Sequence, residues 1–353
     1  MQDLVCQMQD KYCTPVYKKG RTMPELSVVI IGRNEGERLA RCIQSVQNMH
    51  NAPELEIIYV DSDSTDGSPA LAKKLGVHHV LTVKPERPSA ALGRNAGWQV
   101  ATAPFVLFLD GDTSVDPNFV NVALERLKNM SKVAIVWGNL QELHPEASIY
   151  QRILNLDWIY PTGFVEFCGG NAMMRRDVLQ QVDGYNANLI AGEEPEMCHR
   201  IRSLDYLILH IDSPMGLHDL GMTKWSQYWK RATRTGFAYA EISQRFKNTT
   251  FPLWRKDAIK NLIHATVLSG LFILGFIASL WYMCLLPIFF SILIFLLLSL
   301  RSAWKSRWKS KNYGTLFLYG LHSQFQQIPI ALGQLNYYYK RWYGKKQALI
   351  EYK

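Results

Sequence analysis

The stretch that decides the fold of this chain is Phe105-Val-Leu-Phe-Leu-Asp-Gly-Asp112. Its five apolar residues have the length of a strand and do not alternate with polar ones, which is typical of a strand buried on both faces. Asp110 and Asp112 follow that strand, and two carboxylates one residue apart suit a hard divalent cation such as Mg²⁺ or Mn²⁺. Asp and Gly are also favoured in ordinary turns, so the pair alone leaves a purely structural role open.

Segments typical of strands and of helices alternate on both sides of this stretch, which predicts an α/β fold with a doubly wound, mostly parallel sheet. The predicted strands are residues 26–31, 55–60, 77–83, 105–109, 133–137 and 206–211. Residues 167–174 are predicted to be a strand entered through the flexible pair Gly169-Gly170 and followed by the start of a helix. The predicted helices are residues 37–49, 68–75, 89–102, 117–129 and 225–246, and residues 192–202 are predicted to be a loop that runs into a helix. Pro117 and Pro195 are placed in first helical turns.

Acidic clusters follow three of the predicted strands. They are Arg33-Asn-Glu35, Asp61-Ser-Asp63 and Asp110-Gly-Asp112. The carboxyl ends of parallel strands meet at one edge of a sheet, and ligands of such folds bind outside that edge. The pattern therefore favours a metal and nucleotide site over unrelated turns.

Residues 261–300 contain no Lys, Arg, Asp or Glu, which is enough apolar chain to cross a bilayer twice. We predict a membrane hairpin over residues 258–300, with helices at 261–281 and 285–300. A buried helical hairpin of a soluble protein and a shallow re-entrant hairpin are the alternatives.

The net charge of +9 is concentrated beside the apolar block, in residues 301–311 and 340–346. Lys and Arg mixed with Trp next to a span indicate an anionic, cytoplasmic membrane surface, whereas nucleic-acid binding does not explain the apolar block. Residues 316–339 are predicted to be amphipathic, so 301–353 forms a basic interfacial segment.

The cysteines and the N-terminal residues predict the cellular compartment of the chain. The six Cys are scattered without a Cys-x-x-Cys pair, which fits a reducing cytosol. Residues 1–23 lack the apolar core of a signal peptide and are predicted to be a tail. These features predict a multi-pass protein of the inner (plasma) membrane with its catalytic domain in the cytoplasm.

Six segments, in order, resemble the motifs of family 2 glycosyltransferases: 26–35, 60–68, 93–97, 108–112, 169–171 and 192–197. The resemblance implies a GT-A fold and an inverting transfer of sugar from a nucleotide donor, most simply a UDP-sugar. It implies a catalytic domain over residues 24–250. One departure is Asp63, which stands where Gly is common in the family.

Site roles follow from the resemblance position by position. It implies that Glu35, Asp61 and Asp63 lie near the nucleoside and Arg94 near the ribose or phosphate. It implies a metal held by Asp110 and most directly by Asp112, with His218 in the region of a further ligand. Gly170 and Asn171 belong to the acceptor-side motif. The family's catalytic acidic pair, usually Glu-Asp, is Glu193-Glu194 here, and we choose Glu194 as the base while leaving the pair open.

The chemistry gives these residues roles independently of the resemblance. An inverting transfer needs a general base for the acceptor hydroxyl, for which Glu194 is suited. It also needs positive charge on the departing diphosphate, from the cation at Asp112 with Arg231 or Arg234. The structural alternatives are that Glu193 and Glu194 favour a helix N-terminus and that His218 is a loop histidine. For Arg231 and Arg234 the alternative is a solvated or headgroup-facing helix surface.

An acceptor pocket could involve further residues, but their spacing does not select them: Glu142, His144, Trp158 and Glu166. Cys168 and Cys198 are expected to be small buried residues rather than nucleophiles.

The leading hypothesis is a membrane-anchored, metal-dependent inverting glycosyltransferase that makes cell-envelope glycan or glycolipid on a lipid-linked or glycan acceptor. A processive polysaccharide synthase is the first alternative, although its usual Gln-x-x-Arg-Trp motif is missing, since Gln227 is followed by Tyr-Trp-Lys-Arg. A non-catalytic membrane adaptor and a nucleotidyltransferase, which would release pyrophosphate, are the others.

Overall fold

The computed structural model describes residues 23–84, 89–189, 191–249 and 252–344. The predicted tail at residues 1–23 therefore lies outside the described part except for Met23. The chain divides into two compact units, Met1–Leu143 with Tyr160–Leu220, and His144–Ile159 with Gly221–Lys353. This division places residues 144–159 and 221–250 outside the unit that holds the sheet, so the boundaries 24–250, 258–300 and 301–353 stay predictions for functional domains.

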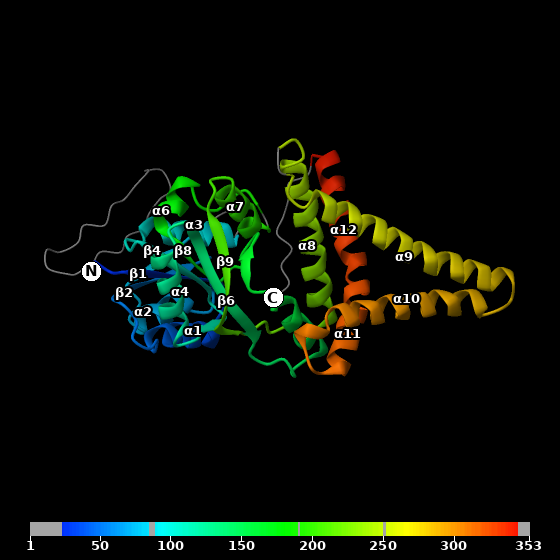
Figure 1. Cartoon of the computed structure of the whole chain (residues 1–353), viewed down its shortest axis with the longest axis horizontal. Coiled ribbons are helices and arrows are strands. Elements are labelled where there is room, and N and C mark those ends of the chain that lie inside the picture. The colour runs from blue at the N-terminus through cyan, green and yellow to red at the C-terminus, as the bar shows by residue number, and fades with distance from the viewer. Residues whose placement is uncertain (1–22, 85–88, 190, 250–251, 345–353) are drawn as a thin grey trace. The chain divides into compact units, whose positions relative to one another are not determined.

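The first unit is built on one nine-stranded sheet in the order β3-β2-β1-β4-β8-β6-β9-β5, with β7 paired to β9 (Figure 1). The strands are β1 (Leu26–Gly32), β2 (Leu55–Asp61), β3 (His79–Thr82), β4 (Phe105–Asp110), β5 (Thr113–Val115), β6 (Val133–Glu142), β7 (Gly163–Val165), β8 (Ala172–Arg175) and β9 (Leu207–His218).

The register of the parallel strands brings the predicted acidic ends together. β1 pairs in parallel with both β2 and β4, so that Gly32 lies opposite Asp61 and Ile31 opposite Asp110. β8 runs antiparallel between β4 and β6, while β6 and β9 are parallel again. The predicted mostly parallel α/β fold is confirmed, and the acidic clusters do share one edge.

The described residues of this unit also form six helices: α1 (Glu37–Gln47), α2 (Ser68–Lys74), α3 (Ala90–Val100), α4 (Phe119–Asn129), α6 (Arg176–Gln181) and α7 (Glu193–Arg202). Two predicted details are wrong. Pro117 lies before the N-cap Asn118 rather than in the first turn of α4, and His218 is the last residue of β9 rather than part of a loop. β5 and β7 were not predicted, because three residues are too few to show a period.

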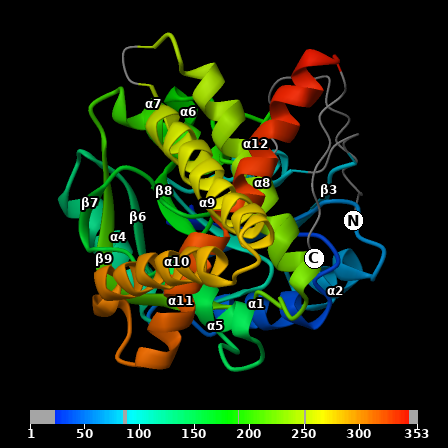
Figure 2. The ribbon, with the colours of Figure 1, turned by 90° about the vertical axis from the view of Figure 1, so that its right-hand side faces the viewer.

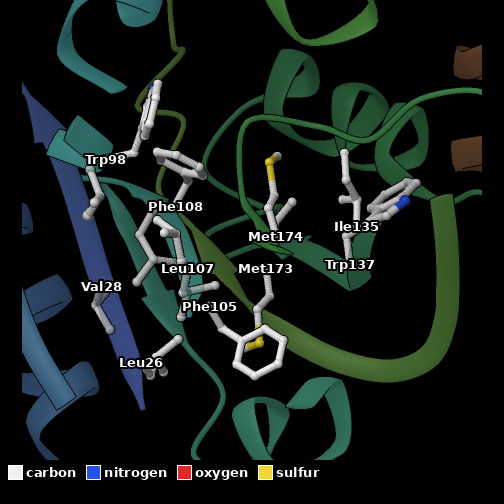
Figure 3. Packing of buried hydrophobic residues seen from close by; sticks show 14 of the residues in the cluster. Leu26, Val28, Trp98, Phe105, Leu107, Phe108, Ile135, Trp137, Met173 and Met174 are labelled. Carbon is white, nitrogen blue, oxygen red and sulfur yellow. The ribbon is translucent and has the colours of Figure 1, made fainter. Parts of the chain in front are cut away.

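The core consists of the apolar runs in the middle of this sheet (Figure 3). Val28 of β1, Leu107 and Phe108 of β4 and Met173 of β8 are all 0% exposed. Strands buried on both faces make a rigid support, because each side chain is fixed by close packing. The loops at the carboxyl edge therefore start from fixed positions.

The second unit is helical in its described residues. Its helices are α5 (Ile149–Asn155), α8 (Trp225–Arg245), α9 (Arg255–Trp281), α10 (Leu286–Lys305), α11 (Tyr313–Phe325) and α12 (Gln327–Trp342), with short 3₁₀ turns at Leu156–Trp158 and Arg307–Lys309. The predicted amphipathic segment 316–339 is thus two helices that meet at Gln326.

α9 and α10 form a hairpin that extends beyond the other helices of its unit (Figure 1). Both are long and apolar enough to cross a membrane by length and composition, and only 22% and 17% of their most apolar windows are buried. Small residues let them approach closely, because a Cβ at Gly275 would lie 2.2 Å from Ser291 Oγ. Low burial disfavours the alternative of a core hairpin in a soluble protein.

α8 and α12 lie side by side and touch backbone to backbone (Figure 1 and Figure 2). A Cβ on Gly333 would lie 2.0 Å from Thr233 O, and one on Gly236 would lie 1.8 Å from Ile330 O. We expect Gly333→Val to force the helices apart and to destabilise the protein by about 3 kcal/mol, measured as a lower melting temperature of the purified chain in detergent.

Gly270→Val is the matched control, since nothing lies within 4 Å of a Cβ at that position on α9. The close approach of α8 and α12 would be refuted by a Gly333→Val protein that melts at the same temperature as this control.

Candidate active site

Three side chains that could hold a metal ion meet at the carboxyl edge of the sheet. Asp110 ends β4, Asp112 follows two residues later, and His218 ends β9 opposite Thr113 of β5. His218 Nε2 lies 3.2 Å from Asp112 Oδ1. One ligand atom from each of the three lies within 4.8 Å of the others, so the structure brings together all three residues predicted to hold a metal.

The donor chemistry of this cluster fits a divalent cation. Two carboxylates supply the hard oxygen ligands that Mg²⁺ and Mn²⁺ prefer, and an imidazole adds a nitrogen that Mg²⁺ rarely uses. Asp112 is only 4% exposed, so its carboxylate is held inside the protein where an ion would have few competing waters.

Arg94 joins this cluster to the predicted catalytic pair. Its guanidinium, 2% exposed, places Nη2 3.0 Å from Asp110 Oδ1 and Nη1 3.0 Å from Glu193 Oε1 and 3.2 Å from Glu194 Oε1. A buried cation is tolerated when several carboxylates surround it in this way. The structure thus directs Arg94 at carboxylates, and its predicted contact with ribose or phosphate stays a prediction.

Glu194 has the properties of a general base. Burial and the neighbouring charge of Glu193 raise its pKa to about 7, against the opposing effect of Arg94. A base is most effective when its pKa lies near the working pH. The side chain of Glu194 is 18% exposed and that of Glu193 only 6%, so Glu194 is the more accessible of the two.

The position of this pair in α7 also agrees with the structural alternative, in which the two carboxylates stabilise the N-terminus of a helix. Glu193 and Glu194 occupy the first turn of α7, just after Gly192, whose φ of 82° lies in the left-handed region. Acidic side chains stabilise a helix at that end. The geometry is compatible with both roles, and the choice of base stays a prediction.

Gly170 and Asn171 lie against this same group of charges. Asn171 Oδ1 accepts a hydrogen bond of 2.9 Å from the backbone N–H of Asp110, which fixes the end of β4. A Cβ on Gly170 would lie 2.3 Å from Arg94 Nη2 and 3.2 Å from Glu194 Oε1. Both residues help to position the polar cluster, and their acceptor-side role stays a prediction.

We expect Gly170→Ala to displace Arg94 and to lower kcat/KM for donor turnover by about 10- to 100-fold, the usual effect of disturbing the support of a site. Gly169→Ala is the matched control, since nothing lies within 4 Å of a Cβ there. Equal kcat/KM values for the two variants would contradict the positioning role of Gly170.

The loops after β1 and β2 are bound to each other on the nucleoside side of the predicted site. Asn34 N–H donates to Ser64 Oγ at 2.8 Å, and Asn34 Oδ1 accepts from Thr65 N–H at 2.8 Å. Asp61 is 0% exposed, with its oxygens accepting from Tyr59 OH and Ser64 N–H at 2.8 Å each. Asp61 thus orders these loops, and its contact with a nucleoside stays a prediction.

Asp63 and Glu35 also have clear positions. Asp63 has a φ of 61° and an ion pair of 3.2 Å with Lys84. A left-handed backbone favours Gly, and Asp is one of the few other residues that tolerate it. Glu35 Oε2 lies 3.0 Å from Arg38 Nη2, and Glu35 Cγ would lie 3.1 Å from a Cβ on Gly111. Glu35 thus lies beside Gly111, within the Asp110–Asp112 segment that is predicted to hold a metal.

Other predicted residues are not brought to this cluster by the structure as described. Arg231 and Arg234 lie on α8 of the second unit, where Arg231 Nη1 is 4.0 Å from Asp157 Oδ2, so their role at a diphosphate stays a prediction. Among the four acceptor-pocket candidates, Glu142 Oε2 accepts from Leu220 N–H at 3.2 Å and Glu166 is exposed, while His144 and Trp158 belong to the second unit.

Cys168 and Cys198 are buried with their sulfur atoms 3.6 Å apart, consistent with the predicted packing role. Sequence reasoning missed Tyr185, whose ring centroid lies 5.5 Å from Arg94 Cζ. A single aromatic residue in a loop gives no periodic signal that could have revealed it.

Known proteins resemble this chain in sequence and fold. Residues 27–183 match the model of glycosyl transferase family 2. The glycosyltransferase AglE of Haloferax volcanii is 23% identical over 208 residues, covering 56% of this chain and 67% of that protein. The poly(ribitol-phosphate) β-N-acetylglucosaminyltransferase TarP of Staphylococcus aureus is 32% identical over 114 residues, covering 31% of this chain and 34% of TarP.

Among solved structures, the mannosyltransferase PcManGT from Pyrobaculum calidifontis, in complex with GDP-Man and Mn2+, superposes with a TM-score of 0.56. It is 17% identical, and the match covers 92% of this chain and 91% of that one, which shows a shared fold. Together with the family match, the predicted fold and the predicted class of enzyme are confirmed. Residues 27–183 thus form a glycosyl transferase family 2 domain, and this chain is a glycosyltransferase.

Proposed function

We propose that this enzyme transfers a sugar, with inversion, from a nucleotide sugar to an acceptor hydroxyl, using the cluster around Arg94. The observation that carries the proposal is the bridge made by Arg94, which lies 3.0 Å from Asp110 and 3.2 Å from Glu194. Through Arg94, the carboxylate of Asp110, which is suited to bind a metal ion, lies near the carboxylate of Glu194, which is suited to accept a proton. The fold neighbour that holds GDP-Man and Mn2+ supports the donor class.

The reaction balances as a single displacement at the anomeric carbon. The acceptor oxygen forms a bond to that carbon from the face opposite the diphosphate, and Glu194 accepts the hydroxyl proton. The bond from the anomeric carbon to the diphosphate oxygen breaks, and its electron pair leaves with the nucleoside diphosphate. Attack on the opposite face inverts the configuration.

Asp110, Asp112 and His218 would hold the divalent ion, which when bound supplies positive charge to the departing diphosphate. The imidazole favours Mn²⁺ over Mg²⁺ at this position, because carboxylates suit both ions and nitrogen ligands suit the transition metal better. A UDP-sugar is the first donor to test and a GDP-sugar the second.

We further propose that residues 258–300 anchor the enzyme in the plasma membrane, with the catalytic domain over residues 24–250 in the cytoplasm. The exposed apolar surfaces of α9 and α10 support this, and two crossings return the basic residues 301–311 to the cytoplasmic side. Residues 301–353 then lie at the anionic interface. A site held near headgroups favours a lipid-linked acceptor, in the synthesis of cell-envelope glycan or glycolipid.

The test uses the full-length protein in lipid nanodiscs with a panel of UDP- and GDP-sugars, Mn²⁺ or Mg²⁺, and a membrane lipid extract as acceptor. We expect metal-dependent release of a nucleoside diphosphate and a product with one added sugar in the inverted anomeric configuration. A long polymer would favour the synthase, pyrophosphate the nucleotidyltransferase, and binding without turnover the adaptor.

A further inference from the structure

A cavity of about 230 Å³ lies in the second unit, between the end of α8, the first turns of α9 and the second half of α12. It is smaller than the roughly 300–1,000 Å³ of sites that enclose a whole drug-sized ligand. A headgroup with the first carbons of its chains is a better match in size. None of the residues assigned above to sugar transfer lines this cavity.

The lining changes from basic to apolar along α9. Arg255, Ala258, Ile259 and Leu262 follow the helical spacing of one face, so the cationic residue stands at the start of the helix and the apolar ones one to two turns later. Lys247, beyond the end of α8, adds a second cation. No described carboxylate forms an ion pair with either cation, and the helix N-terminus adds further positive potential.

A buried amide lines the same cavity with an unused acceptor. Gln334 is 0% exposed, and among the described residues its Oε1 has no hydrogen-bond partner. Its Nε2 donates to Ala258 O at 3.1 Å and to Asn261 Oδ1 at 2.7 Å. A buried acceptor without a donor is costly, so a ligand that supplies the donor would be favoured.

Hydrogen bonds among neighbouring side-chain amides determine which atom of the Gln334 amide lacks a hydrogen-bond partner. Asn261 Nδ2 donates to Gln327 Oε1 at 2.7 Å and to Gln327 O at 3.0 Å, and Gln327 Nε2 donates to Ser323 O at 3.0 Å. Rotating any of these amides by half a turn would set an oxygen against a carbonyl. The open position of Gln334 is therefore an acceptor, not a donor.

We propose that this cavity binds the headgroup of a membrane phospholipid, with its phosphodiester between Lys247 and Arg255 and a headgroup hydroxyl or ammonium donating to Gln334 Oε1. The acyl chains would follow Ile259 and Leu262 toward the apolar part of α9. This rests on the membrane association proposed above but not on sugar transfer. A phosphate alone does not satisfy the site, because an ionised phosphodiester has no hydrogen to give to Gln334.

The test measures which lipids stay bound to the full-length protein by native mass spectrometry, after release from nanodiscs of phosphatidylcholine with equal parts phosphatidylglycerol and phosphatidylmethanol. The last two lipids carry the same charge, but only phosphatidylglycerol has headgroup hydroxyls. We expect phosphatidylglycerol to be retained about 10-fold over phosphatidylmethanol, the effect of one hydrogen bond to a buried acceptor.

Paired variants separate this site from general attraction to an anionic surface. Lys247→Gln with Arg255→Gln should lower retention of phosphatidylglycerol about 10-fold, whereas Lys256→Gln with Lys260→Gln, which do not line the cavity, should change it less than 2-fold. Gln334→Met should remove the preference over phosphatidylmethanol.

Several results would overturn the proposal: equal retention of the two anionic lipids by the unmodified protein, equal losses in the two paired variants, or displacement of the lipid by soluble glycerophosphoglycerol at matched concentration. The last result would assign the cavity to a soluble phosphodiester. The measurement detects bound lipid and not turnover. A negative result would therefore refute the lipid site without affecting the proposed sugar transfer. Likewise, an absence of sugar transfer would not refute the lipid site.

Discussion

Asp112→Asn is expected to abolish Mn²⁺ binding and to lower kcat for donor turnover by about 10³-fold, the scale seen when a group that stabilises developing charge is removed. The variant keeps the shape of the side chain but replaces a carboxylate, 3.2 Å from His218, by a neutral amide. Bound and free Mn²⁺ are measured by electron paramagnetic resonance, and kcat by release of nucleoside diphosphate.

Asp116→Asn is the matched control for this experiment. Asp116 lies four residues further on, and its Oδ1 accepts from Asn118 N–H at 2.9 Å before α4, outside the metal cluster. The control should bind Mn²⁺ as the unmodified protein does. If Asp112→Asn also keeps its Mn²⁺ and its turnover, the cluster of Asp110, Asp112 and His218 is not the metal site.

Glu194→Gln is expected to lower kcat by about 10²- to 10⁴-fold while donor and Mn²⁺ still bind, because only the proton acceptor is lost. Glu193→Gln is the comparison on the same helix turn, since both carboxylates contact Arg94. A larger loss of kcat in Glu193→Gln than in Glu194→Gln would make Glu193 the base.

The pH dependence of kcat gives an independent test of the same residue. With the pKa of Glu194 raised to about 7, the carboxyl is protonated below that pH and cannot accept a proton. Activity should therefore rise about tenfold per pH unit on the acid side and level off above the pKa. A metal cation bound nearby favours the ionised carboxylate of Glu194, so it shifts the acid side of the pH profile of kcat to lower pH. The rise on the acid side should disappear in Glu194→Gln, and its persistence would exclude Glu194 as its source.

The sheet and its functional edge could be predicted because they depend on local patterns. Apolar runs such as Val28–Ile31 and Val106–Leu109 have strand length and no alternation, and parallel pairing then places Asp61 and Asp110 at one edge without further information. The family motifs added the acidic pair at Glu193 and Glu194.

The connections inside the site could not be predicted. Arg94 contacts Glu193 and Glu194, which lie 99 and 100 positions later in the sequence. The periodicity of a sequence predicts local secondary structure, but it does not predict contacts between residues so far apart. The same limit applies to His218, where the strand β9 extends through a polar stretch, 212–218, that resembles a loop in composition. Pairing with β5 and β6 overrides the local preference there.

The segment His144–Ile159 is inserted in the chain between β6 and β7 but belongs to the helical unit, and this affects how the nascent protein matures. Asp157 Oδ1 accepts from Tyr319 OH at 2.9 Å, and Leu156 O accepts from Lys309 Nζ at 2.7 Å. These partners are translated more than 150 positions later. At roughly 5–20 residues per second, the ribosome needs on the order of ten to thirty seconds to deliver them. During that interval residues 144–159 lack the helices that they pack against in the complete protein. In a chain truncated after β9 this segment would never gain those partners, and we expect proteases to cleave it.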